Sequence, residues 1–304
     1  MRRGLTATLS LTVLACGMTG CAAFEADRSG IVVTTNILGD ITREIVGDET
    51  DVTVLMKPGA DPHSFGVSAK QAAALENAEL IIHNGLGLEE GVARHVEAAA
   101  ETGVPTYAVG EAVDPLEYGA GETAGQADPH FWTDPVRVGE AVDLIAGQVT
   151  EHVDVDTDTD TVNAQASDYG DEIAKLHSEA KTAFGRIPKR DRELVTNHHV
   201  FGYLAKRYDF EVIGAVVPSG TTLASPSSAD LKDLADKVKA TDVPAVFVDS
   251  SQPDRLARAM ADETGIEVKV IALYSESLSS SGEEAATYVE MTRFNVEAIA
   301  DGLD

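Results

Sequence analysis

The chain has 304 residues, of which 43% are hydrophobic and 24% are charged, enough to build the cores of two domains of ordinary size. Its formal net charge of -28 at pH 7 argues against nucleic acid as a partner, because phosphate binding needs a basic face. Such acidity is typical of solubility or of adaptation to salt, and it remains compatible with a metal cation as ligand.

The first residues are predicted to be a lipoprotein signal peptide, residues 1–21. Two arginines precede an apolar run, Leu5 to Leu14, which is too short to span a membrane as a mature helix. Met18-Thr19-Gly20-Cys21 resembles a bacterial lipobox, which implies cleavage before Cys21 and lipidation of its thiol. Cys16 is a weaker candidate, and a plain secretion signal is the alternative. Residues 22–30 are predicted to be a tether, and no thiol remains for a disulfide.

From residue 31 onward, β-branched runs alternate with amphipathic stretches, which is the pattern of parallel βαβ units. The segment Glu111–Gln126 interrupts it and is predicted to be a mobile loop. Together these residues form a predicted N-terminal α/β lobe, 31–150. The strands expected in it are Ile31–Asn36, Val52–Met56, Glu79–His83 and Thr106–Val109. The helices expected are Ile37–Val46, Ala69–Asn77 capped by Ser68, Glu89–Ala100 and Pro135 to about Val149.

The next segment, 151–188, is predicted to hold an acidic loop and a long linking helix from Val162 to Phe184. The loop's alternating aspartates lack the glycine turn and distant glutamate of a calcium-binding EF-hand, so we interpret them as solvated. A C-terminal α/β lobe, 189–304, follows. Its expected strands are Glu193–Asn197, Val212–Val217, Ala245–Asp249 and Val268–Tyr274. Its expected helices are Val200–Tyr208, Ala229–Ala240, Asp254–Thr264 and Ala285–Gly302.

Chemically active side chains follow the ends of several predicted strands. His63 and His130 lie in proline-flanked loops of the N-terminal lobe, whereas His198 and Glu276 follow strands of the C-terminal lobe. Ligands of open α/β sheets bind beyond the carboxyl ends of the strands, so we expect these residues to converge between the lobes. Three neutral imidazoles and one carboxylate suit a closed, four-coordinate zinc site, whereas manganese prefers more oxygen ligands.

The motifs around these residues resemble those of the metal-binding lipoproteins of zinc and manganese ABC importers. The resemblance covers essentially the whole mature chain and implies two α/β lobes joined by one long helix, with the metal between them. The segments that carry it are Pro58–Phe65, Asp128–Pro135, Thr196–Tyr203, Tyr274–Leu278, Asn84–Glu89 and Met291–Asn295.

The resemblance implies that His63, His130 and His198 are metal ligands. The third position is histidine in zinc binders of the family and often glutamate in manganese binders. Glu276 stands where the family usually has aspartate, so the carboxylate is kept with one added methylene. Asp249 is the alternative carboxylate ligand, and His199, which stands where an acidic residue is common, is the alternative to His198.

The expected function is capture of Zn2+ outside the membrane and delivery to an ABC permease and its ATPase, with Mn2+ as the alternative cargo. We expect a monomer, lipid-anchored to the cell membrane or periplasmic, with a zinc metallochaperone as a further candidate partner. An adhesin or metal-storage lipoprotein and a zinc hydrolase are the competing interpretations. Catalytic zinc usually has three protein ligands and an open water position, and the sequence contains no HExxH helix, so we predict no enzyme activity.

Overall fold

The computed structural model describes residues 28–119, 123–153 and 159–304. The predicted signal peptide with Cys21, most of the tether and the aspartates of 154–158 lie outside these ranges. The N-terminal elements are β1 (Ile31–Val33), α1 (Asn36–Val46), β2 (Val52–Val54), α2 (Ala69–Glu76), β3 (Leu80–His83), α3 (Glu90–Glu101), β4 (Thr106–Ala108), α4 (Val109–Ala112), η1 (Phe131–Thr133), α5 (Pro135–His152) and α6 (Thr159–Phe184). The C-terminal elements are η2 (Lys189–Asp191), β5 (Glu193–Thr196), α7 (Gly202–Tyr208), β6 (Glu211–Ala215), α8 (Ser228–Thr241), β7 (Ala245–Asp249), α9 (Arg255–Thr264), β8 (Lys269–Leu273) and α10 (Tyr288–Leu303).

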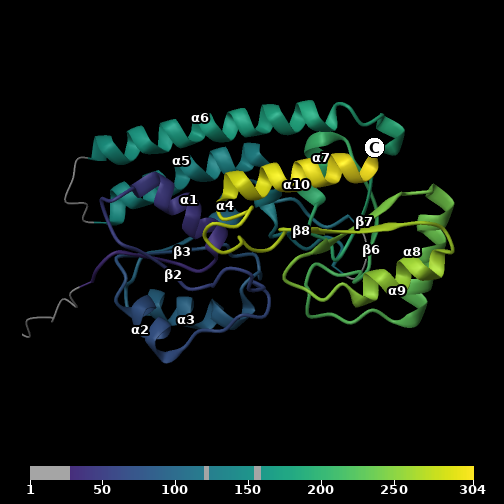
Figure 1. Cartoon of the computed structure of the whole chain (residues 1–304). Helices are drawn as coiled ribbons and strands as arrows, with labels where there is room; N and C mark the ends of the chain where they lie inside the picture. Colours follow the sequence, from purple (N-terminus) through teal and green to yellow (C-terminus); the bar gives the residue numbers. More distant parts are fainter. Residues whose placement is uncertain (1–27, 120–122, 154–158) are drawn as a thin grey trace, which may run out of the picture.

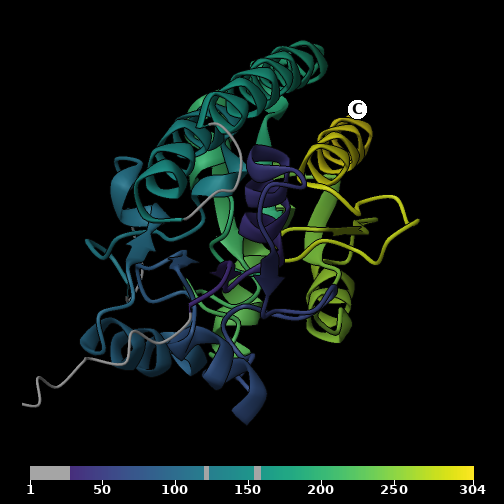
Figure 2. The same ribbon diagram turned by 90° about the vertical axis from the view of Figure 1, so that its left-hand side faces the viewer.

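Two parallel, four-stranded sheets lie side by side, with helices on both faces of each (Figure 1). The strand orders are β2-β1-β3-β4 and β6-β5-β7-β8, so the second sheet repeats the order of the first. In the N-terminal lobe, α2 and α3 cover one face of the sheet and α1 and α5 the other, and α6 packs on the outside of α5 and α1 (Figures 1 and 2). The predicted α/β class with two parallel sheets is confirmed. The predicted lobe boundaries at residues 150 and 189 remain predictions.

The sequence begins its helices with side chains that satisfy free backbone N–H groups. Ser68 accepts from Gln71 N while the Gln71 side chain accepts from Ser68 N, a capping box that confirms the predicted start of α2. Ser227 with Asp230 and Thr287 with Glu290 form the same motif at α8 and α10. Each box satisfies two backbone N–H groups at the start of its helix and so defines where the preceding loop ends.

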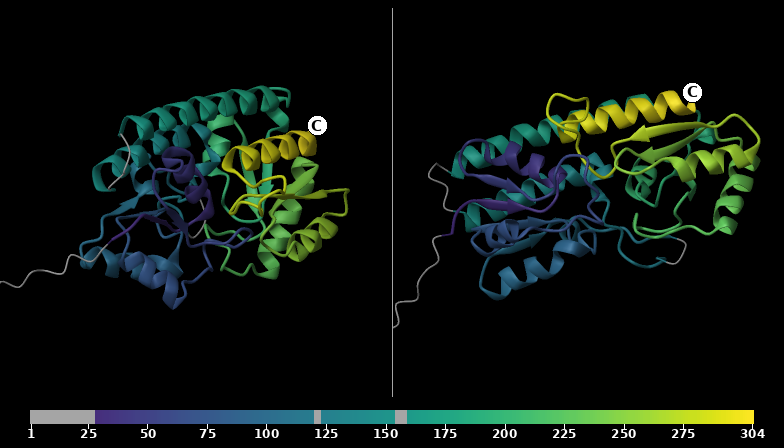
Figure 3. Two further views of the ribbon diagram at one scale, coloured as in Figure 1. Left: turned by 60° about the vertical axis from the view of Figure 1, so that its left-hand side comes forward. Right: turned by 60° about the horizontal axis from the view of Figure 1, so that its bottom comes forward.

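Two helices link the lobes. The first half of α6 packs into the N-terminal core through Val162, Tyr169 and Ile173, and its end packs into the C-terminal core through Phe184. The C-terminal helix α10 does the same, because Tyr288, Val289 and Met291 belong to the first core and Val296, Ile299 and Leu303 to the second. The views in Figures 2 and 3 show α10 running beside α6 along the same side of both sheets. The sequence predicted only the first of these links.

The segment Glu111–Gln126, predicted to be a mobile loop, begins inside a helix and contains a hydrogen-bonded turn. Its first residues continue α4, and Tyr118 exchanges backbone hydrogen bonds with Gly125 and Gln126. An isolated bridge between Glu117 and Ala127 closes the turn. The hydroxyl of Tyr118 contacts His130 of the N-terminal lobe and Gly220 of the C-terminal lobe.

No helix in the three described stretches is both long enough and apolar enough to cross a membrane.

Candidate metal centre

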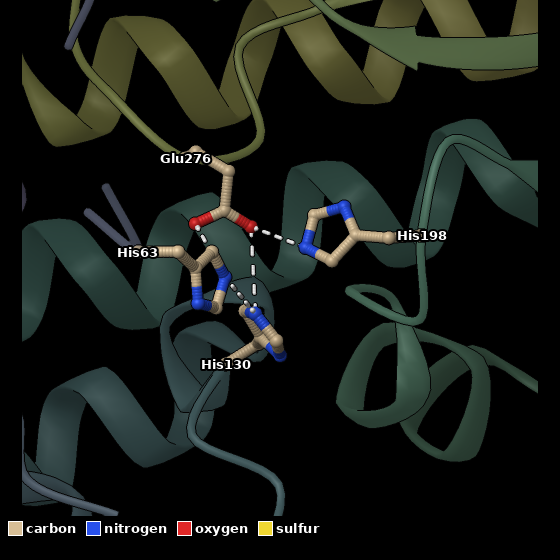
Figure 4. Close-up of side chains that lie close together, drawn as sticks. All are labelled: His63, His130, His198 and Glu276. Atoms are coloured by element: carbon tan, nitrogen blue, oxygen red, sulfur yellow. Dashed lines mark hydrogen bonds and ion pairs between the residues drawn. The ribbon is translucent and has the colours of Figure 1, made fainter. Parts of the chain in front are cut away.

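The structure brings the four predicted ligand residues together. His63 follows β2, His130 precedes η1, His198 follows β5 and Glu276 follows β8. One ligand atom from each lies within 4.8 Å of the others, which makes these residues the one such group found among the described residues (Figure 4). Side chains that are as much as 213 positions apart in sequence (276 minus 63) therefore converge on one point.

The distances between the ligand atoms match those around a small divalent cation. His130 Nε2 lies 3.5 Å from His63 Nε2 and 3.4 Å from Glu276 Oε1. Glu276 Oε1 lies 2.9 Å from His198 Nε2, and Glu276 Oε2 lies 3.9 Å from His63 Nε2. Four ligands arranged tetrahedrally around zinc would be about 3.3 Å apart. The cluster thus has the size of a four-coordinate site.

Burial keeps the three imidazoles in the neutral form that binds metal, but it favours the protonated form of Glu276. His130 and His198 are fully buried, and His63 and Glu276 nearly so. Burial lowers the pKa of His63 to about 3, with help from the neighbouring imidazoles, and lowers the pKa of His130 and His198 as well. Burial also raises the pKa of Glu276 well above its ordinary value. The imidazoles are neutral near pH 7, and a divalent cation would replace the proton of Glu276.

Two copies of the tripeptide Asp-Pro-His hold the N-terminal pair of histidines. Asp61 Oδ1 accepts the backbone N–H of His63 at 2.9 Å, and Asp128 Oδ1 accepts the backbone N–H of His130 at 3.0 Å. Such a bond from an aspartate to the backbone two residues later is an Asx-turn. The intervening proline restricts the backbone further. Both motifs therefore present an imidazole from the same local turn.

The two aspartates differ in the other contacts that their carboxylates make. Asp128 Oδ1 also lies 2.7 Å from His130 Nδ1, and the Tyr118 hydroxyl lies 3.3 Å from the same nitrogen. A proton held between His130 Nδ1 and Asp128 leaves the lone pair of Nε2 directed at the cluster. Asp61 makes no such contact with its histidine ring. Its Oδ2 instead accepts hydrogen bonds from Thr222 and Gln252 of the C-terminal lobe.

Several polar atoms at the centre have no hydrogen-bond partner. Both nitrogens of His198 and both oxygens of Glu276 are buried and unpaired, although His198 Nε2 and Glu276 Oε1 are close neighbours. Leaving such groups unpaired in the interior costs about 1–3 kcal/mol each. A bound cation would satisfy the atoms that face the cluster, so these atoms fit the proposed ligand set.

The segment that contains Glu276 is held from both lobes. Asp249, the alternative ligand, lies outside the cluster, and its Oδ2 accepts Glu276 N–H at 3.1 Å and Ser275 Oγ–H at 2.6 Å. From the N-terminal lobe, Asn36 Nδ2 donates to Ser277 Oγ at 2.7 Å. Asp249 thus positions the backbone of Glu276.

His199 also lies outside the cluster: its backbone N–H donates to Ser219 O, and its ring lies 6.5 Å from that of Tyr118.

The residues that sequence reasoning missed are those that hold the ligands in place: Asn36, Asp61, Tyr118 and Asp128. The repeated Asp-Pro-His tripeptide was a visible signal for the two aspartates. An aspartate side chain often accepts the backbone N–H two residues later, which in both tripeptides is that of the histidine. Asn36 and Tyr118 gave no local signal because their partners are distant in sequence.

A family model described as "Zinc-uptake complex component A periplasmic" (ZnuA) matches residues 31–302. The metal ABC transporter substrate-binding lipoprotein SsaB of Streptococcus sanguinis is 29% identical, with 96% of this chain and 94% of that protein covered. The manganese ABC transporter substrate-binding lipoprotein PsaA of Streptococcus mitis is 30% identical, with coverages of 97% and 96%. The solved structure of the periplasmic zinc-binding protein TroA of Treponema pallidum has a TM-score of 0.83 at 27% identity, covering 91% of this chain and 99% of that one.

The match to the family model spans both lobes and all four clustered residues, and the TroA structure has the same two-lobed fold. The relatives are transport proteins rather than enzymes, which confirms that prediction. The chain belongs to the ZnuA family of extracytoplasmic, metal-binding components of ABC transporters, which work with a permease and an ATPase.

Proposed function

We propose that this chain captures Zn2+ with His63, His130, His198 and Glu276 and delivers it to the permease of an ABC importer. The observation that carries the proposal is the donor set: three buried neutral imidazoles and one carboxylate at the spacing of a four-coordinate site. Imidazole suits zinc, whereas manganese favours carboxylate, carbonyl and water.

A manganese receptor is the second candidate, because the S. mitis relative is named for manganese. Glu276 supports this alternative in one respect. Both of its oxygens face the cluster without hydrogen-bond partners, so it can bind a cation through two oxygens. The site would then offer three nitrogen and two oxygen ligands, a set closer to what manganese prefers.

The decisive measurement is the elemental content of the protein purified without added metal. We expect zinc in excess over manganese, and an excess of manganese would overturn the zinc assignment. In a second step, His198→Glu replaces one imidazole with a carboxylate and should shift the bound ratio toward manganese. Competition alone discriminates poorly, since Zn2+ binds most nitrogen and oxygen sites more tightly than Mn2+ does.

The ligand set has its own test. His63→Ala should lower zinc affinity by orders of magnitude, measured by competition with a chromophoric chelator, while the metal-free protein stays folded. His95→Ala is the matched control, because His95 is an exposed histidine of α3. Equal affinities of the His63 variant and the wild type would contradict the assignment.

We further propose that the mature chain is a monomer anchored to the membrane through lipid on Cys21. The relatives named as lipoproteins support the anchor. A Cys21→Ala variant should lose membrane association on cell fractionation, and retention in the membrane fraction would contradict the proposal. Delivery of zinc by a metallochaperone is a further interaction that purified components can test.

A further inference from the structure

An ion held by the four residues is enclosed by protein. His63, the most exposed of them, is only 4% exposed, and His130 and His198 are not exposed at all. An ion can therefore leave only after some of the contacts that cover these residues separate. A contact that opens to release the ion should join the two lobes without being part of either hydrophobic core.

Several links between the lobes involve side chains of a hydrophobic core, and a further one is the ion pair of Arg207 on α7 with Asp134, 2.7 Å apart. Tyr203 of α7 donates to Asp128 O at 2.7 Å, but its ring belongs to the N-terminal core. The segment Ser275–Leu278 is tied to the N-terminal lobe by Asn36, and by Trp132 Nε1, which donates to Ser275 O at 2.9 Å. The same segment is tied to the C-terminal lobe by Asp249. The contacts of Tyr203 and of Ser275–Leu278 lie among buried side chains on both sides.

The Asp61 carboxylate forms a link of a different kind. Its Oδ2 accepts Thr222 Oγ1–H at 2.6 Å and Gln252 Nε2–H at 3.0 Å, while its Oδ1 accepts the backbone N–H of His63. Thr222 lies in the loop after β6 and Gln252 in the loop after β7, and both are only partly buried. One side chain thus joins the loop of a predicted ligand to two loops of the other lobe.

The loop of Thr222 touches the second Asp-Pro-His turn as well. The Tyr118 hydroxyl, which lies beside His130 Nδ1, also donates to Gly220 O at 3.4 Å. A Cβ on Gly220 would lie 2.5 Å from the Tyr118 ring, so the loop packs closely on that side chain. Residues 219–222 therefore contact the supports of both N-terminal histidines.

We propose that Asp61 is a positioning residue that sets how long the ion is retained, because its carboxylate holds the loops of Thr222 and Gln252 closed over the His63 turn. The proposal rests on the proposed function, since it assumes an ion at the four clustered residues. When the loops part, water replaces both donors at Oδ2, so opening costs the difference between two charge-assisted hydrogen bonds and their hydrated counterparts. Closure and the placement of His63 are thereby coupled through one side chain.

The test removes the donors and leaves Asp61 and the four clustered residues intact. Thr222→Val and Gln252→Leu, alone and together, are compared with the wild type in the full chain loaded with Zn2+. Dissociation is followed by stopped-flow with an excess of chromophoric chelator, and association is measured separately. A hydrogen bond to a charged group contributes about tenfold or more to an equilibrium constant. We expect the double variant to release Zn2+ roughly tenfold to a hundredfold faster, with an association rate within about twofold of the wild type.

Two control variants distinguish loss of the hydrogen bonds to Asp61 from a general disturbance of the loop that contains Thr222. Thr222→Ser keeps the hydroxyl donor and should restore slow release. Leu223→Ala changes a neighbouring side chain that is 53% exposed, and it should release Zn2+ at the wild-type rate. Hydrogen exchange gives a second readout: Zn2+ should protect residues 219–222 in the wild type but much less in the double variant.

The outcomes distinguish the two proposals. If the wild type binds Zn2+ tightly and the double variant releases it at the wild-type rate, the role of Asp61 is wrong and the proposed function stands. If the wild type binds no Zn2+, or His63→Ala binds it equally well, the proposed function fails and this inference fails with it. Faster release in Leu223→Ala to the same extent would also overturn the inference, because the effect would then belong to the loop as a whole.

Discussion

The two Asp-Pro-His turns of the N-terminal lobe share one local structure and serve two different purposes. In both, an aspartate accepts the backbone N–H of the histidine two residues later, at 2.9 Å for Asp61 and 3.0 Å for Asp128. Asp128 then contacts the ring nitrogen of its own histidine. Asp61 uses its second oxygen to accept hydrogen bonds from the opposite lobe.

The difference shows that the tripeptide determines the local turn that holds the histidine. It does not determine which other groups the aspartate carboxylate contacts. Asp128 orients an imidazole and fixes which nitrogen faces the cluster, a role that acts on affinity. Asp61 is placed to act on opening, a role that acts on the rate of release. The two aspartates should therefore differ in which binding parameter they change, although they lie in the same tripeptide.

Among changes to the supports of the two turns, the largest effect is expected for Asp128→Ala, which removes the partner of His130 Nδ1. Loss of such an orienting carboxylate typically lowers metal affinity by roughly tenfold to a hundredfold. Competition with a chromophoric chelator measures the affinity. Tyr118→Phe removes only the more distant contact to the same nitrogen and should cost less. An affinity for the Asp128 variant within about threefold of the wild type would mean that the ring is oriented by packing alone.

A second prediction concerns pH, and its sign follows from the buried groups. Burial lowers the pKa of His63 to about 3, so this imidazole is already neutral above pH 5 and does not compete with the ion for a proton. Burial raises the pKa of Glu276 well above its ordinary value, so its proton must leave when the ion binds. Zinc affinity should therefore rise with pH by up to about tenfold per unit until that raised pKa is passed.

Calorimetry in two buffers of different ionisation enthalpy counts the protons released. We expect about one per Zn2+ at pH 6 for the wild type and none for Glu276→Gln. The same raised pKa has a consequence for the metal-free protein. Its free energy of unfolding should fall as the pH rises from the pKa of Glu276 in the unfolded chain to the higher pKa of Glu276 in the folded protein. Release of a second proton would show that another group of the site is protonated before binding, and Asp128, whose pKa burial raises to about 7, is the first candidate.

The smallest effect concerns the prolines. Pro62→Ala and Pro129→Ala each relax one turn, and each should lower the free energy of unfolding by about 0.4–1 kcal/mol, because proline restricts the unfolded chain. Both changes should cost the same amount, since the local turns are the same. Urea unfolding of the metal-free protein measures them. A clear inequality would show that the turns are not equivalent even before their aspartates are compared.

Much of the fold was predictable because it depends on neighbours in sequence. The Ser68 capping box and the strand Ala245–Asp249 appear as expected, as does the long helix that ends at Phe184. Two features were not predicted. The start of the 111–126 segment is helical, and α10 contributes to both cores, because Tyr288 packs against residues more than 100 positions away. No local pattern contains that information.

For the site, the sequence by itself determined which four residues to expect together, because they follow predicted strands or lie in motifs that resemble those of metal-binding lipoproteins. The Asx-turns that present two of them are also local features, although the sequence analysis did not identify them. It also suggested Asp249 and His199 as alternatives, and the structure places both outside the cluster. Only the tertiary structure decided that Asp249 holds the backbone of Glu276, that Asp128 faces a ring, and that Asp61 faces the other lobe. The physical reason is that each oxygen's partner comes from a different part of the chain, and those parts meet only when both lobes are folded and packed together.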